Sequence, residues 1–154
     1  MDSWKTIETQ KDIETLFDIY FGFHDACIVS ASYQSGATVD HEGTMHYSDA
    51  SGHQLVLLFQ SQMAMKNLEL RFIGLRQMHL VGWEDNYSCE LSEAYLAFAH
   101  ELLPGEPKKQ IIWSSYAWFN PEKIDNTIHE PADTYIIANE LRWRLLDYSN
   151  SSLS

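Results

Sequence analysis

The sequence predicts a mainly β protein of the α+β class, in which an N-terminal helix packs on an antiparallel sandwich or a partly closed barrel of about seven or eight strands. Three observations lead to this fold class. Helical spacing of apolar residues is strong in one early segment, alternating patterns dominate afterwards, and short turns join most of the later segments. Strands and helices do not alternate along the chain, which argues against a doubly wound nucleotide-binding sheet.

The predicted helix follows Thr9, a suitable N-cap residue whose capping-box partner is Asp12. Gly22 stands where a helix end favours a left-handed residue, and Phe23 after it is placed to fold back on Phe17. One apolar stripe at helical spacing is formed by Ile13, Leu16, Phe17, Tyr20 and Phe21.

The first strands are predicted from alternation and from turn residues. Residues 28–34 are expected to form a strand, Ser35 and Gly36 a tight turn, and residues 38–47 the strand that returns beside the first. A second turn at 49–52 leads into residues 55–59, an apolar run typical of a central strand.

A one-face alternation over residues 68–72 predicts the next strand, which Gly74 is expected to end. Residues 75–81 are expected to form a separate strand after it.

Residues 92–103 fit either a helix or a strand. We favour a strand that forms a hairpin with residues 111–119 around a Pro-Gly turn at 104–105. Asn120 and Pro121 suit the start of a short helical turn near 121–126, and alternation over 135–143 predicts a last strand.

The chain is long enough and apolar enough to bury a core, with 154 residues of which 45% are hydrophobic and 13% aromatic. We expect one globular domain over residues 1–148 and a disordered tail over 149–154. No apolar run approaches the ~20 residues that span a bilayer, and the N-terminus lacks a secretory signal pattern. Two cysteines, Cys27 and Cys89, suit reduced thiols, although one bridge stays open. These features predict a cytoplasmic protein.

Negative charge is distributed unevenly in a chain whose net charge is −12. Residues 12–65 contain seven acidic residues and no Lys or Arg, and residues 77–107 contain six acidic residues and again no Lys or Arg. Such a surface repels nucleic acids and anionic membranes, and it attracts a basic protein. The ordinary alternative is that the charge serves solubility alone.

The segment 21–27 joins the helix to the first strand and brings together His24, Asp25 and Cys27. If this segment is extended, His24 and Asp25 point to opposite faces, and they act together only if the chain turns between them. Cys27 would then lie on the face of Asp25, away from His24, as a buried and inert thiol. We therefore assign no catalytic residue.

Asp25 would lie on a largely apolar face, where a carboxylate needs hydrogen bonds or a cation. We expect backbone N–H groups, Arg142 or Arg144 to satisfy it, so that the three side chains serve as a structural polar anchor.

Histidines at 41, 46 and 53 lie near acidic residues on the predicted hairpin, which suggests a metal site. Regular strand geometry brings only two of them, His46 and His53, together as possible ligands, fewer than zinc sites use. We expect neither a metal nor another cofactor. An aromatic set that either packs in the core or exposes a binding patch consists of Trp113, Trp118, Trp143, Tyr116 and Tyr135.

Several short segments together resemble a known group of proteins. They are residues 23–28 (FHDACI), 35–36 (SG), 59–62 (FQSQ), 69–75 (ELRFIGL) and 141–144 (LRWR). This pattern resembles a poorly characterised family of small bacterial proteins that is similar to the immunity proteins of polymorphic toxin systems, and it covers most of residues 20–145. The resemblance implies a cytoplasmic, non-enzymatic protein with a largely β fold and a hairpin at 93–118. It supplies no active-site residues.

The leading functional hypothesis is a protein-binding domain, in the manner of an immunity protein, that covers the active site of a basic partner. The expected binding residues are Asp40, Glu42, Asp49, Glu84 and Asp85. Two alternatives stay open. One is an enzyme or small-ligand binder with a pocket near His24, Asp25 and His100, and the other is a structural homo-oligomer whose exposed strand edges pair.

Overall fold

A computed structural model describes residues 3–81, 90–124 and 133–147 of the chain. The helical elements are α1 (Gln10–Ile19) and the 3₁₀ turns η1 (Phe21–Phe23), η2 (Ala50–Gly52) and η3 (Pro121–Lys123). The strands are β1 (Lys5–Thr6), β2 (Ala26–Gln34), β3 (Ala37–Val39), β4 (Met45–Tyr47), β5 (Gln54–Ser61), β6 (Lys66–His79), β7 (Glu90–Leu91), β8 (Tyr95–His100), β9 (Lys109–Ser114) and β10 (Tyr135–Asp147).

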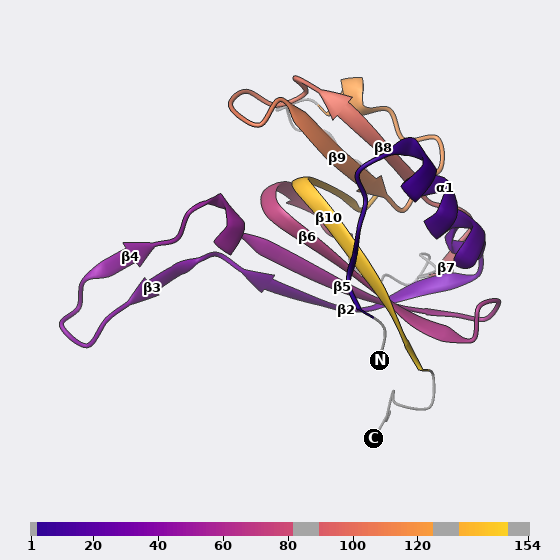
Figure 1. Ribbon diagram of the computed structural model, residues 1–154, viewed down its shortest axis with the longest axis horizontal. Helices are drawn as coiled ribbons and strands as arrows, with labels where there is room; N and C mark the ends of the chain where they lie inside the picture. The colour runs from indigo at the N-terminus through magenta and orange to yellow at the C-terminus, as the bar shows by residue number, and fades with distance from the viewer. Residues whose placement is uncertain (1–2, 82–89, 125–132, 148–154) are drawn as a thin grey trace.

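One antiparallel sheet dominates the structure, with the strand order β7-β2-β5-β6-β10-β9-β8. Strand β10 organises one half of the sheet, because it pairs with β6 along its length, with β9 near its start and with β1 near its end. The sheet curls into a half-barrel, and α1 packs against its inner side (Figure 1). The predicted mainly β fold, an N-terminal helix on a partly closed antiparallel barrel, is confirmed.

The N-terminus of α1 matches the predicted capping box. Asp12 N donates to the Thr9 hydroxyl, and Thr9 N donates in return to the Asp12 carboxylate. Ile13 and Leu16 of the predicted stripe are buried, whereas Phe21 is 49% exposed because the helix ends before it.

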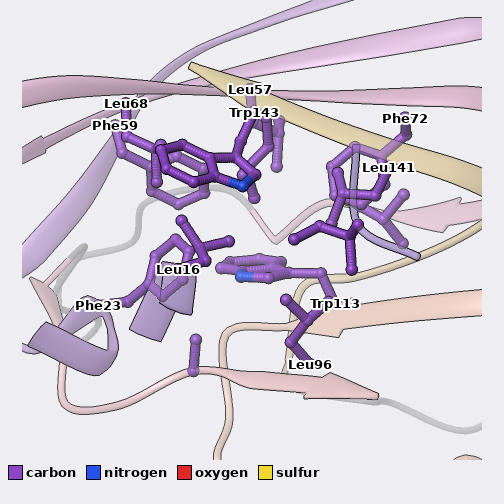
Figure 2. Packing of buried hydrophobic residues seen from close by; sticks show 14 of the residues in the cluster. Leu16, Phe23, Leu57, Phe59, Leu68, Phe72, Leu96, Trp113, Leu141 and Trp143 are labelled. Carbon is purple, nitrogen blue, oxygen red and sulfur yellow. The ribbon is translucent and has the colours of Figure 1, made fainter. Parts of the chain in front are cut away.

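An aromatic cluster fills the interior between helix and sheet. The ring of Phe23 makes edge contacts with Phe17 and Tyr20 on the helix side and with Phe59 and Trp113 on the sheet side, at centroid distances of 5.2–5.7 Å. Figure 2 shows Leu16 and Phe23 facing these two sheet residues across the interior. The predicted packing of Phe23 on Phe17 is confirmed, and Phe23 ties the helix to both halves of the sheet.

The predicted hairpin around Ser35 and Gly36 is wrong. β2 pairs with β5 over its whole length, and the register reaches Gln34 opposite Gln54. The residues between these two strands leave the sheet and form the separate β3–β4 hairpin, which projects from the body (Figure 1). We call residues 35–53 the arm. Local alternation within the arm resembles that of a core strand, but it is β5 and not the arm that pairs with β2.

Gly74 does not end a strand, in contrast to the prediction. β6 continues through it to His79, and a register shift against β10 accommodates the change. Gly74 has φ +67°, and a Cβ there would approach Asn139 Nδ2 to 2.4 Å, so only glycine fits beside this part of β10.

Several later predictions are confirmed. Residues 95–100 form a strand, β8, in an antiparallel hairpin with β9. Asn120 caps η3 by accepting the Glu122 N–H, and β10 begins at Tyr135. The predicted disordered tail at 149–154 and the end of the predicted domain at 148 lie outside the described residues.

Exchanging Phe23 for alanine tests how much the fold depends on this ring. We expect Phe23→Ala to lower the free energy of unfolding by about 3–5 kcal/mol, because a fully buried ring leaves a cavity. Phe21→Ala is the matched control, since Phe21 has a similar positive φ but an exposed side chain, and it should cost less than about 1 kcal/mol. Urea denaturation measures both losses, and equal losses would contradict the role assigned to Phe23.

Candidate functional site

The joint between α1 and β2 has an unusual backbone. Phe21, Phe23 and Asp25 all have positive φ, between 53° and 68°, although none of them is glycine. Tertiary hydrogen bonds hold this conformation: Asp25 N donates to Leu91 O, and Asp25 O accepts from Gln62 N, each at 3.0 Å. Left-handed conformations of such residues cost energy and persist only where the surroundings impose them.

The turn brings together side chains that an extended chain would separate. Asp25 Oδ2 lies 2.9 Å from His24 Nδ1, and the Asp25 side chain is 28% exposed. The hydrogen bond that the protonated Glu90 carboxyl group donates to the Asp25 carboxylate, followed by the negative charge of Asp25, raises the pKa of Glu90 on the adjacent strand β7. Glu90 therefore takes up a proton more readily than an isolated glutamate does. The prediction that His24 and Asp25 diverge is therefore wrong.

The predicted anchor between Asp25 and the late arginines is also wrong. Arg144 Nε lies 2.7 Å from Glu69 Oε1, its direct partner across β6 and β10, and Arg142 Nε lies 2.7 Å from Glu140 Oε1. Asp25 precedes β2, which β5 and β6 separate from β10 in the sheet. Each arginine therefore meets a nearer carboxylate on its own part of the sheet.

Among the residues that the structure describes, the other candidates for chemistry do not join His24, Asp25 and Glu90 at the joint. Cys27 lies opposite Glu90 in the β2–β7 register, and Ala26 rather than Cys27 is the buried residue at the start of β2, so the expectation that Cys27 points inward is wrong. His100 pairs with Lys109, whose ammonium donates to Glu8 O before the start of α1. The joint follows the other end of this ten-residue helix, about 15 Å away along its axis.

The arm presents an apolar face that the described part of the protein leaves uncovered. In the β3–β4 register Val39 lies opposite Met45, and Ala37 lies opposite Tyr47, so all four side chains share one face. Val39, Met45 and Tyr47 are 60%, 54% and 76% exposed. The exposed aromatic residues Tyr116 and Trp118 lie elsewhere, after β9, whereas Trp113, Trp143 and Tyr135 are buried.

Acidic side chains border this face. Asp40 lies at the tip of the arm, where its carboxylate accepts the Glu42 and Thr44 N–H groups and contacts His46 Nε2 at 2.7 Å. The hydrogen bond with His46 is the main cause that lowers the pKa of Asp40, and the hydrogen bond from the Ser51 hydroxyl lowers the pKa of Asp49. Both groups therefore stay ionised in mild acid. The other two predicted binding residues, Glu84 and Asp85, lie outside the described residues.

The base of the arm is rigidly packed. Ser48 sits between two glycines, and a Cβ on either Gly36 or Gly52 would meet the Ser48 hydroxyl at 2.1 Å. Ser48 N donates to Gly36 O, and His53 O accepts the N–H groups of Gly74 and Leu75 on β6. The arm is therefore fixed to the body at a defined angle.

The three histidines on and beside the arm do not form a ligand set. His46 lies opposite Thr38 and contacts Asp40, rather than His53 as predicted. Among residues 3–81, 90–124 and 133–147, no group of three His, Cys, Asp or Glu side chains is suited to hold a metal ion. Within the same residues no helix is long and apolar enough to cross a membrane.

Sequence reasoning missed two features of these sites. The apolar face of the arm was detectable as an alternation at 37, 39, 45 and 47, but its exposure depends on where the flanking strands pair. Glu90 carried no local signal, because only the β2–β7 pairing brings it to Asp25.

Comparison with known proteins finds no matching protein family, no matching curated protein and no matching solved structure. Function is therefore inferred from the chain's own residues.

Replacing Asp25 with asparagine tests whether Asp25 makes Glu90 hold its proton more tightly. The raised pKa of Glu90 means that the folded protein holds this proton more tightly than the unfolded chain does, so its contribution to stability is largest in acid and is lost as pH rises through the raised pKa. In Asp25→Asn the carboxylate charge is gone and the amide can donate to Glu90, so the pKa of Glu90 should fall towards its ordinary value. An NMR titration of the Glu90 side-chain carboxyl carbon measures this shift.

Asp18→Asn, which removes an exposed acid from α1, is the control and should leave the Glu90 titration unchanged. An unchanged Glu90 titration in Asp25→Asn would contradict the assignment of the raised pKa of Glu90 to Asp25.

Proposed function

We propose that this protein is a cytoplasmic protein-binding domain that recognises a basic partner through its arm, as an immunity protein that neutralises a basic toxin would. The observation that carries the proposal is the exposed apolar face of Val39, Met45 and Tyr47, bordered by Asp40 and Glu42. A central apolar patch with a charged border is the usual composition of a protein-recognition surface.

The apolar face of the arm needs a partner for physical reasons. A two-stranded hairpin by itself is marginally stable in water, and this one has every β3 and β4 residue exposed. Tyr47 is the best anchor, because a tyrosine buries a large rigid ring, and its hydroxyl group, which donates to Met45 Sδ at 2.9 Å, can still accept a hydrogen bond. Because the base of the arm is already packed before binding, less conformational entropy is lost when a partner binds.

The charge of the arm selects the partner. Residues 12–65 contain no Lys or Arg, so the bases of this stretch that lie beside these acids are histidines, His46 beside Asp40 and His41 beside Glu42. A basic surface is attracted over about 10 Å at moderate salt and is oriented before contact. Neutralisation of a toxin then follows if the arm occupies its basic active site.

The two alternatives find less support. A second copy of the chain would bring another net charge of −12 against the same acidic arm. A small-ligand or catalytic site at the joint would use the Asp25–Glu90 pair, but His100 lies at the other end of α1. Binding of a basic protein is the function that uses both the exposed apolar face of the arm and the acidic residues that border it.

Truncating Tyr47 tests the proposal in the setting where a partner is encoded, by co-expression with the product of each neighbouring gene. We expect one basic product to co-purify and to stop inhibiting growth when this protein is present. Tyr47→Ala should weaken that complex by about 2 kcal/mol, roughly thirtyfold in Kd, as loss of a central aromatic anchor does. Phe21→Ala is the matched control, an exposed aromatic residue at the opposite end of β2, and it should leave Kd unchanged.

Charge is tested separately by Glu42→Lys, with Glu14→Lys on α1 as a control of equal charge change. The arm variant should slow association several-fold at low salt and lose this effect at high salt, whereas the helix variant should change it much less. The proposal is wrong if no basic neighbour binds, or if the arm and control variants behave alike.

A further inference from the structure

The methionines of this protein lie at its surface. Each methionine that the structure describes has an exposed side chain, although methionine is among the residues most often buried in folded proteins. The exposed fractions are 54% for Met45, 48% for Met63, 61% for Met65 and 37% for Met78. An exposed thioether is open to oxidation, so the position of each methionine decides what its oxidation would change.

Met45 differs from the other three because it belongs to the apolar face of the arm. It lies directly opposite Val39 in the β3–β4 register, and Tyr47 follows it on the same face of β4. The other described methionines lie on β6 or in the turn before it. Met45 is therefore the methionine that a partner bound to the arm would cover.

A hydrogen bond joins Met45 to the expected anchor residue. The Tyr47 hydroxyl donates to Met45 Sδ at 2.9 Å. A thioether sulfur is a weak acceptor, whereas a sulfoxide carries a polar oxygen on a new bond from the sulfur. Oxidation of Met45 would therefore move the acceptor of the Tyr47 hydroxyl, and with it the preferred position of the tyrosine ring.

The chemical step is the transfer of one oxygen atom from a peroxide. A lone pair of Met45 Sδ attacks one oxygen of hydrogen peroxide, and the S–O bond forms as the O–O bond breaks. The proton of the transferred oxygen passes to the leaving oxygen, which departs as water. The sulfur is oxidised by two electrons and the peroxide is reduced by two. Methionine sulfoxide reductases restore the thioether, with the oxygen leaving as water and two thiols oxidised to a disulfide.

A sulfoxide at Met45 would oppose burial of the apolar face. Its oxygen binds water in the free protein, and a partner that covers the arm has to remove this water. A polar group that is buried without its hydrogen bonds weakens a complex. The net charge is unchanged by the reaction, so the attraction of a basic partner persists while the contact that holds it is weakened.

We propose that Met45 is a modification site, at which reversible oxidation to the sulfoxide releases the basic partner from the arm. This inference rests on the proposed function and adds its regulation. It is supported by the exposure of Met45, by its place on the apolar face and by its contact with Tyr47.

Hydrogen peroxide treatment of the full chain, followed by digestion and mass spectrometry, tests the reactivity of the site without a partner. We expect Met45 to be oxidised at a rate within about threefold of that of Met65, because their exposed fractions are similar. The two classes of methionine sulfoxide reductase, one for each sulfoxide epimer, should together restore Met45. Oxidation of Met45 at least about tenfold slower than that of Met65 would overturn the inference.

The effect on recognition is measured with the basic gene product that co-expression recovers. Oxidation of the present protein, before it is mixed with the untreated product, should raise Kd about tenfold. The reductases should restore the original Kd, whereas dithiothreitol alone, which reverses disulfide and sulfenic acid formation but not sulfoxide formation, should not. Recovery with dithiothreitol alone would assign the effect to a cysteine and would overturn the inference.

Substitutions at matched positions separate Met45 from the other methionines. Met45→Leu keeps the face apolar and removes the sulfur, so its Kd should lie within about threefold of the wild-type value and should not change after peroxide treatment. Met45→Gln places a polar side chain on the arm and should raise Kd about tenfold, whereas Met65→Gln should leave it unchanged. Thermal unfolding shows whether each variant is folded.

The inference and the proposed function fail in different ways. If the basic product binds and Tyr47→Ala weakens the complex, but oxidation changes Kd equally in Met45→Leu and the wild type or in neither, regulation at Met45 is wrong and recognition by the arm stands. If no basic product binds the reduced protein, the proposed function is wrong, and regulation of binding at Met45 is wrong with it.

Discussion

The position of the Phe23 ring is the constraint on which the rest of the structure depends. A sheet curled into a half-barrel leaves its inner face open, and in this protein the ring of Phe23 packs there against Phe59 and Trp113. Full burial of such a ring contributes roughly 1.5–3 kcal/mol, which is enough to offset an unfavourable backbone conformation. Phe23 takes a φ of 68°, and the chain turns sharply on either side of it. The burial of one side chain thus determines the direction in which β2 begins.

The joint and the place of β2 in the sheet are both consequences of that direction. Because the chain leaves the core through a turn and not an extended strand, Asp25 meets His24 and Glu90 at the surface. β2 then runs beside β5, and its first two residues pair with β7 on the other side. The core residue that closes the half-barrel therefore also sets where β2 enters the sheet.

The sequence predicted the elements whose signals are local and failed where distant contacts decide. The capping box of α1, the β8–β9 hairpin and β10 depend on neighbouring residues, and all were predicted correctly. Gly74 suggested a strand end, but its role depends on Asn139 in a distant strand, which requires a glycine at that point. The positive φ of Asp25 was invisible because no glycine marks it, and the partner of its side chain was predicted wrongly for the same reason.

The arm shows the same distinction between a local sequence pattern and tertiary strand pairing. That distinction also bears on the recognition that we propose for the arm. Alternation at Val39, Met45 and Tyr47 has the form of a core strand, yet the pairing of β2 with β5 excludes these residues from the core. A flexible acidic loop would attract a basic surface equally well, because attraction at a distance requires only charge. The packed base of Gly36, Ser48 and Gly52 adds a fixed orientation, which lowers the entropy lost when the apolar face is buried. In the complex that we propose, charge therefore sets the rate of encounter and the oriented apolar face sets the lifetime.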